Sequence, residues 1–413
     1  MSISISTRSD RFLLILTLGA LTALGPLAID LYLPALPTIA KDMGEPLSQI
    51  QYSLSAYTIG FAVSQLLFGP LSDRFGRKKV MFPGIAAFII TNFMAALCAD
   101  ATQLIVVRVL QAIAAGAIMV TIPAMIRDLF PKEQVAKTLS SILLVMTVAP
   151  LMAPLAGGQI LKYFGWESLF ICLGVAGSLS LLLALARIKE TLPTEHRLEI
   201  PPAQLVANYL TVARNREALG CMLCHAFFFG GMFAFITGSP FVYIELFHVP
   251  AEQYGLLFGV NILAMAATNM LNMRLVGRFQ LLTIVRTGSL LSATVAFIAL
   301  FNAWSGLGGL AGIMLPVVIY IACLSLTGPN SNALSLSHFP KSAGTANALA
   351  GALRFTIGGV ASAMVGVLHD GTAMPMAMVM AVCGSLSVVS LLLVKSAGQS
   401  ASKPESPVST SHT

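Results

Sequence analysis

Three charged side chains interrupt long apolar stretches of this sequence: Asp30, Arg108 and Arg354. Of the seventeen Asp and Glu residues, we expect Asp30 alone to lie well inside an apolar segment, although nearer one end. An ionised carboxylate that leaves water costs free energy, so it acquires a partner or takes up a proton. Such residues mark proton relays and ligand sites. Asp30 is therefore the first candidate for proton transfer or ligand binding; the alternative is a structural carboxylate that is hydrogen-bonded between helices.

Arg108 and Gln111 form a second candidate pair. Their spacing of three residues places both side chains on one face of a helix. Arg108 is a candidate to neutralise Asp30 or to alter its protonation. The alternative is that Arg108 extends its side chain toward water and has no such role. For Arg354, a structural role and a functional role remain equally open.

The elements that hold these residues must be membrane helices, because the composition excludes a water-facing surface. The 413-residue chain is 56% apolar and 10% charged, and its mean hydropathy is +0.84. A soluble domain carries about 25% charged residues. The composition therefore excludes a soluble enzyme, a nucleic-acid-binding protein and a disordered chain, and it predicts an all-α integral membrane protein.

The apolar runs predict twelve transmembrane helices, since each crossing needs roughly 20 apolar residues. The runs lie near residues 12–39, 47–71, 80–99, 104–126, 138–161, 166–186, 218–242, 254–276, 282–301, 308–330, 343–368 and 373–394. With a cytoplasmic N-terminus, 20 of the 24 Lys and Arg residues fall on the cytoplasmic side, and only Lys41 and Lys162 fall on the other. This asymmetry supports the count and places both termini in the cytoplasm.

The longest interior polar stretch divides the runs into six plus six, which is typical of transporters built from two pseudo-repeated halves. The expected parts are a cytoplasmic N-terminus (1–11), an N-terminal six-helix half (12–187), a central cytoplasmic loop (188–217), a C-terminal six-helix half (218–394) and a disordered cytoplasmic tail (395–413).

A basic loop follows the second run and carries the most specific string of the chain, GPLSDRFGRKK at residues 69–79. Lys78 and Lys79 need no further role than the excess of cytoplasmic positive charge. The string as a whole resembles the loop signature of the major facilitator superfamily. The resemblance implies that Asp73 and Arg74 help to latch the inward-closed form, with Asp128 as the acidic partner. The candidate latch residues are Gly69, Asp73, Arg74, Gly76, Arg77 and Asp128.

Two further strings resemble motifs of the same superfamily. The segment from Leu104 through Arg108 to Gln111 is similar to its fourth-helix motif. The fifth run contains PLMAPLAGG at residues 150–158, in which prolines remove backbone hydrogen bonds and paired glycines permit close helix packing. This string resembles the antiporter motif found in exporters; a kinked packing helix is the alternative. Its candidate residues are Pro150, Pro154, Gly157 and Gly158.

Three other strings narrow the resemblance: DLYLPALP at 30–37, SPFVYI at 239–244, and the region 328–346. Together with the fifth-run motif they resemble the bicyclomycin-resistance (Bcr/CflA) family of multidrug exporters, over about residues 10–395. The resemblance implies the twelve-helix major facilitator fold and a drug:proton antiporter of the bacterial cell inner membrane. The resemblance makes bicyclomycin and other antibiotics the candidate substrates.

Aromatic and amide side chains in several runs are candidates to line a drug cavity, because an apolar pocket with few polar anchors suits diverse lipophilic compounds. Packing or lipid contact is the alternative for each aromatic residue. The candidate substrate-binding residues are Asp30, Tyr32, Tyr57, Phe61, Gln111, Phe235, Asn261 and Arg354.

The resulting hypothesis is a transporter in which a proton and a drug compete for Asp30, with Arg108 as the second proton-coupling residue. The expected partners are a small-molecule drug, protons and the lipid bilayer, and we expect a monomer without nucleic acid, metal or cofactor, driven by the proton gradient. A proton-coupled transporter of a sugar, amino acid or organic acid is the alternative. A membrane enzyme or receptor is a remote one, because an enzyme should show acids, histidines or metal ligands clustered at one depth.

Overall fold

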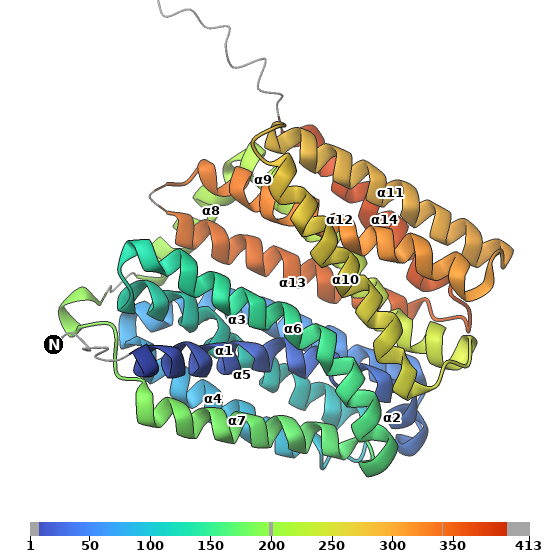
Figure 1. The fold of residues 1–413 in the computed structure, drawn as a ribbon, viewed down its shortest axis with the longest axis horizontal. Helices are drawn as coiled ribbons and strands as arrows, with labels where there is room; N and C mark the ends of the chain where they lie inside the picture. Colours follow the sequence, from blue (N-terminus) through green and yellow to red (C-terminus); the bar gives the residue numbers. More distant parts are fainter. Residues whose placement is uncertain (1–7, 198–200, 341, 395–413) are drawn as a thin grey trace, which may run out of the picture.

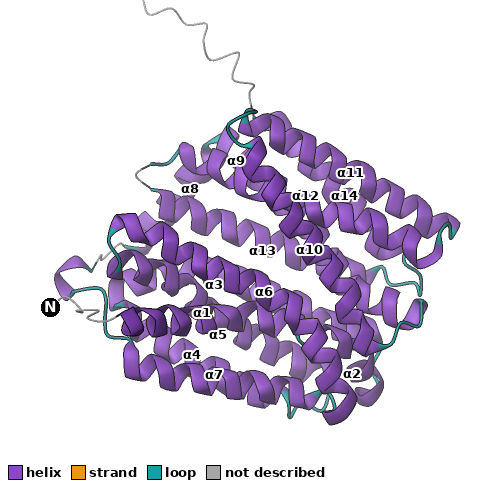
Figure 2. Cartoon of the chain, viewed as in Figure 1, coloured by secondary structure: helices purple, strands orange, loops and turns teal. Residues whose placement is uncertain are grey.

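The computed structural model describes residues 8–197, 201–340 and 342–394. The expected tail, 395–413, and most of the expected N-terminal segment therefore lie outside the described residues. Across the described ranges the chain is helical, with short loops and without an extended strand. Figure 2 shows helices in every layer of the molecule. The all-α fold class is thus confirmed.

The N-terminal part contains six long helices, a short 3-10 turn (Leu33–Ala35) and the short helix α2. These helices are α1 (Arg8–Asp30), α2 (Leu36–Met43), α3 (Leu47–Phe75), α4 (Arg77–Ala95), α5 (Ala101–Leu129), α6 (Lys132–Phe164) and α7 (Glu167–Arg187). Helix α8 (Pro202–Arg214) lies in the segment expected to be the central loop.

The C-terminal part repeats the arrangement of six long helices. They are α9 (Arg216–Pro240), α10 (Ala251–Leu275), α11 (Leu281–Ser305), α12 (Gly309–Ser337), α13 (Ala343–Val367) and α14 (Met374–Ser390). A π-helical turn, Phe241–Leu246, extends α9, and a 3-10 turn, Leu391–Leu393, extends α14.

Each set of six helices packs mainly within itself. In the first half α5 lies against α3 and α4, and α1 lies against α6 and α7; in the second half α9 lies against α13 and α14, and α12 lies against α11. The main contacts between the halves join α3 to α13 and α6 to α10. Figure 1 shows the two halves as blue-green and gold-red layers, with α2 at one end of the bundle and α8 at the other. We refer to these as the α2 end and the α8 end.

Twelve helices among the described residues have 17 or more residues, which agrees with the expected number of crossings. Ten of them are long and apolar enough to cross a membrane by composition alone. The other two are α4, whose first turn carries Arg77, Lys78 and Lys79, and α6. Large side chains exposed along these helices, such as Leu182, Leu315 and Val360, suit contact with lipid.

The first apolar run is not one straight helix. The α-helix ends at Asp30, and the chain turns through Leu33–Ala35 before α2 begins at Leu36. Pro34 and Pro37 explain the break, because each lacks the N–H that a continuing helix needs. Asp30 lies inside the first candidate membrane span, Phe12–Met43, as expected, and it is the last residue of α1, at the break.

Candidate functional site

Asp30 occupies a buried position where the two halves meet. Its residue is 5% exposed, and its carboxylate has no hydrogen bond or ion pair among the described residues. It lies within electrostatic range of the hydroxyls of Tyr57, from the first half, and Tyr254, from the second. The C-terminus of a helix carries partial negative charge, so an anionic Asp30 gains nothing from α1. An unpartnered carboxylate in this setting favours exchange of a proton or binding of a cationic group.

Arg108 is enclosed by aromatic rings and forms no ion pair with Asp30 among the described residues. The residue is fully buried, and its guanidinium carbon lies 4.4 Å from the ring centroid of Tyr32 and 4.2 Å from that of Tyr57. Such stacking stabilises a cation in a place with little water. The direct ion pair of Asp30 with Arg108 is thus absent among the described contacts, and Tyr57 lies near both groups instead.

The expected pairing of Arg108 with Gln111 on one helix face is confirmed. The Arg108 guanidinium donates to the side-chain oxygen of Gln111, whose amide donates to Asn92 on α4 over 2.7 Å. Asn92 in turn donates to the Phe88 carbonyl over 2.7 Å. Arg108 still has two nitrogen groups, Nε and Nη2, without a partner. Asn92 was not among the residues expected from sequence, because its place in the network depends on α4 packing against α5.

Other expected cavity residues lie in the second half or at its border. Phe235 stacks on Phe258 with ring centroids 5.8 Å apart, and Tyr254 bonds Ser239 over 2.9 Å. Phe61 reaches across to Phe355 of α13, with ring centroids 4.5 Å apart.

The amide and cationic candidates of the second half do not gather at one point. Asn261 donates to carbonyls of its own helix at 3.3 Å, which leaves its side-chain oxygen unpaired. Arg354 lies apart, in a narrow crevice with His225. The expected substrate-binding set therefore forms one group around Arg108 and several separate contacts.

Polar bridges between the halves concentrate at the α2 end. Gln51 donates to the Thr237 carbonyl over 3.0 Å, and Ser55 donates to Ser362 over 2.8 Å. At the surface, the Lys162 ammonium lies 3.0 Å from the Glu252 carboxylate. These contacts hold the two halves together at that end of the bundle.

The proline–glycine segment of α6 makes a close helix contact, as its sequence predicts. A Cβ at Gly255 of α10 would lie 2.5 Å from the backbone nitrogen of Leu155 and 2.7 Å from the carbonyl carbon of Pro154. A Cβ at Gly158 would lie 2.6 Å from the Ala251 carbonyl oxygen, and one at Gly157 would overlap the carbonyl oxygen of Leu31. Glycine is needed at these points because no side chain fits between the backbones. Pro150 lies one turn before Pro154, within the same helix.

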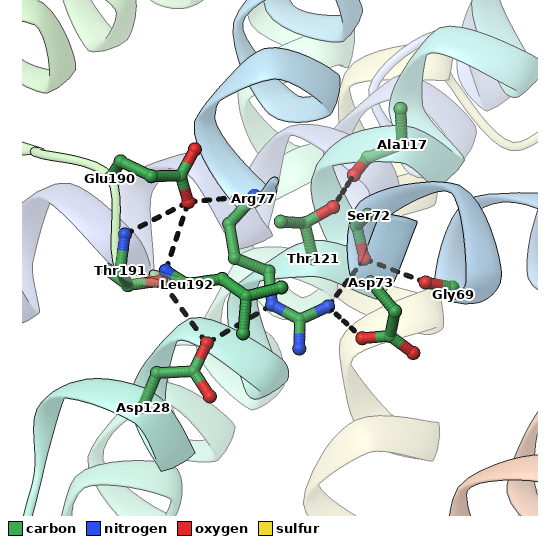
Figure 3. A network of polar contacts seen from close by, with 10 residues as sticks. All are labelled: Gly69, Ser72, Asp73, Arg77, Ala117, Thr121, Asp128, Glu190, Thr191 and Leu192. Atoms are coloured by element: carbon green, nitrogen blue, oxygen red, sulfur yellow. Dashed lines mark hydrogen bonds and ion pairs between the residues drawn. The ribbon is translucent and has the colours of Figure 1, made fainter. Parts of the chain in front are cut away.

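A charge network at the α8 end joins the basic loop to the end of α5 (Figure 3). The Arg77 guanidinium forms an ion pair with Asp73, and its Nε lies 3.1 Å from an Asp128 oxygen. It also donates to Ser72 over 2.7 Å, and the Ser72 hydroxyl donates to the Gly69 carbonyl over 2.9 Å. Asp73 and Asp128 therefore contact the same cation, Arg77.

Arg74, the other residue that the resemblance assigns to the latch, lies outside this network in the structure. Its guanidinium lies over the ring of Phe75, 5.3 Å from the centroid. The residue four positions after Asp73, which is Arg77, takes the partner role, because residues i and i+4 meet on a helix face whereas neighbours in sequence diverge.

Glu190 completes the network and was not among the residues expected from sequence. Its carboxylate accepts the backbone N–H groups of Arg77 at 2.9 Å and Lys78 at 3.2 Å, in the first turn of α4. A carboxylate is stabilising at a helix N-terminus. Gly76 permits this approach: its φ is +104°, and a Cβ there would lie 2.6 Å from a Glu190 oxygen. No spacing in the sequence signals a contact between residues so far apart.

Comparisons with known proteins agree with this architecture. A sequence profile described as Major Facilitator Superfamily matches residues 18–363. A bicyclomycin resistance protein homolog of Haemophilus influenzae is 35% identical over 396 residues, which is 94% of this chain and 98% of that protein. A chloramphenicol resistance protein of Pseudomonas aeruginosa is 29% identical over 359 residues, covering 86% of this chain and 83% of that protein.

Solved structures of low sequence identity share the fold. The nucleoside transporter NupG aligns with a TM-score of 0.73 at 14% identity, over 92% of this chain and 98% of that one. The profile match spans most of the chain, and ten of the long helices are long and apolar enough to cross a membrane. The chain therefore belongs to the Major Facilitator Superfamily and is a multi-pass membrane transporter of small molecules, not an enzyme.

Proposed function

We propose that this protein exports drugs or other small lipophilic compounds in exchange for protons. The observation that carries the proposal is the unpartnered, buried carboxylate of Asp30 at the junction of the two halves. Two relatives support the direction of transport, since their names refer to resistance to bicyclomycin and to chloramphenicol. The close contact of α6 with α10 at the proline–glycine segment supports an exporter as well.

In the proposed cycle, a proton and the drug compete for Asp30. A proton that arrives from outside neutralises the carboxylate and releases the drug; loss of that proton to the cytoplasm restores the charge and favours binding of the next molecule. Coupling requires that the two ligands differ in affinity between the two facing states. Arg108 stays charged beside the site because Tyr32 and Tyr57 stabilise it. Once the drug has left, the positive charge of Arg108 disfavours binding of another cation at the site.

The proposed setting is the bacterial inner membrane, with both termini in the cytoplasm and a monomer as the transport unit. The excess of Lys and Arg at the α8 end supports this orientation, which makes the α2 end periplasmic. The two six-helix halves, 12–187 and 218–394, act as the moving bodies around the central loop, 188–217. The network of Asp73, Arg77 and Asp128 orders the cytoplasmic end of the first half.

The proposal is tested by replacing Asp30 in cells that lack their own drug pumps. Asp30→Asn should abolish resistance to a panel that includes bicyclomycin and chloramphenicol, and should abolish proton-driven efflux from inverted membrane vesicles. Asp30→Glu should retain part of both. Asp42→Asn, an exposed acid on the neighbouring α2, is the matched control. Full resistance in an inserted Asp30→Asn variant, or efflux that persists with an uncoupler, would refute proton exchange at this residue.

A further inference from the structure

A second cation, partly buried, lies in the C-terminal half without an ion pair among the described residues. Arg354 lies deep between α9, α12 and α13 yet keeps part of its surface exposed, and its Nε has no hydrogen-bond partner. These three helices, all of whose residues the structure describes, contain one carboxylate, Glu217, which lies 3.9 Å from His338. A cation removed from water needs an anionic partner. The protein supplies none to Arg354 from these helices.

Polar side chains from α9, α12 and α13 line the crevice around Arg354. His225 lines it from α9 and interacts electrostatically with Arg354. Ser331 lines it from α12; the residue is 1% exposed, and its hydroxyl lies beside the Cys224 thiol. Gly328 leaves room for the imidazole, because a Cβ there would lie 3.0 Å from Nε2. An unpaired donor inside a protein costs free energy, so the Arg354 guanidinium, with Ser331 and His225 beside it, marks a place for an acceptor.

Aromatic rings lie next to His225 and Arg354, although they are not part of the lining of the crevice. The ring of Phe229 lies 6.4 Å from that of His225 and 5.2 Å from that of Phe355, the residue after Arg354. Phe61 continues the aromatic surface into the first half. A ligand that satisfied the cation and remained in contact with these rings would carry an acidic group on an aromatic body.

We propose that Arg354, Ser331 and His225 bind the acidic group of an amphipathic aromatic anion, whose ring packs against Phe229 and Phe355. The crevice is narrow in this structure, so the ligand enters as the halves separate at the α8 end. The proposal rests on the proposed transport function, because it assigns a ligand class to the C-terminal wall of the transport route. It gives acidic drugs an anchor on the opposite half from Asp30.

The test compares two probes of the same shape and different charge. Naphthalene-2-sulfonate and the neutral naphthalene-2-sulfonamide are titrated into the purified full-length protein in detergent by calorimetry. The sulfonate should bind at least about tenfold more tightly, the lower range for a charge-assisted hydrogen bond. Arg354→Gln should remove this preference while it retains sulfonamide binding, and Arg354→Lys should keep part of it. Arg274→Gln, at an exposed arginine of α10, is the control and should leave the preference unchanged.

Several results would overturn the proposal. They are equal affinity for the two probes, failure of both to bind the wild-type protein, or a preference that survives in Arg354→Gln. Competition by inorganic phosphate as strong as that by the sulfonate would refute the aromatic part, because it would indicate a site for a bare anion. The readout here is binding, so it is independent of the efflux test. Loss of transport in Asp30→Asn would leave the affinities for the two probes unaffected.

Discussion

The contact between α6 and α10 offers a direct test of how the α2 end closes. Gly255→Ala would add a methyl group 2.5 Å from the Leu155 backbone nitrogen, whereas ordinary contact begins at 3.4 Å. The difference of 0.9 Å cannot be absorbed by a side chain, because backbone atoms lie on both sides. Overpacking of this kind costs about 1–3 kcal/mol. The variant should shift the equilibrium between facing states by about 5- to 150-fold, away from closure at the α2 end.

The shift is measurable with spin labels at Tyr163 and Gln253, which are exposed at the ends of α6 and α10 near the Lys162–Glu252 ion pair. Gly255→Ala should lengthen the distance between the labels and slow efflux, while the protein remains inserted. Gly344→Ala is the control, because a Cβ at Gly344 meets nothing within 4 Å. An unchanged distance distribution together with wild-type efflux would show that closure at this end does not depend on the glycine contact.

Two further predictions concern the buried charge networks. Arg108→Lys should reduce efflux at least about tenfold without loss of insertion, since an ammonium cannot stack as a plane on Tyr32 and Tyr57; vesicle efflux at wild-type activity would contradict this role. Glu190→Gln should lower the thermal unfolding midpoint, because removing a stabilising charge from the first turn of α4 costs about 0.3–1 kcal/mol. The exposed Glu195→Gln is its control, and equal midpoints for the two variants would refute the capping role.

The surroundings of Asp30 were predicted only in part from the sequence. Its apolar surroundings identified it as unusual, since a carboxylate among so many apolar residues is costly. The sequence did not show that the helix ends there. That outcome depends on Pro34 and Pro37 beginning a new turn, and on α3 and α10 packing around the break, which brings Tyr57 and Tyr254 near the carboxylate.

The charge network at the α8 end was likewise predicted only in part from the sequence. The string at residues 69–79 predicted Asp73 and Asp128 as partners, and helix periodicity alone favours Arg77 over Arg74 as the cation facing Asp73. Glu190 belongs to the segment after α7, and only the packing of α7 against α4 brings it to the Arg77 backbone.

The sequence by itself determined the membrane environment, the number of long helices and the fold family, because these depend on composition, on run length and on local motifs. Local properties of this kind do not need knowledge of which helices meet. The partners of Arg108, the exposed surface of Arg354 and the contact of α6 with α10 were decided only by tertiary structure. Each joins residues far apart in the chain, and in a bilayer, where every helix is apolar on all sides, hydrophobic periodicity does not tell one neighbour from another.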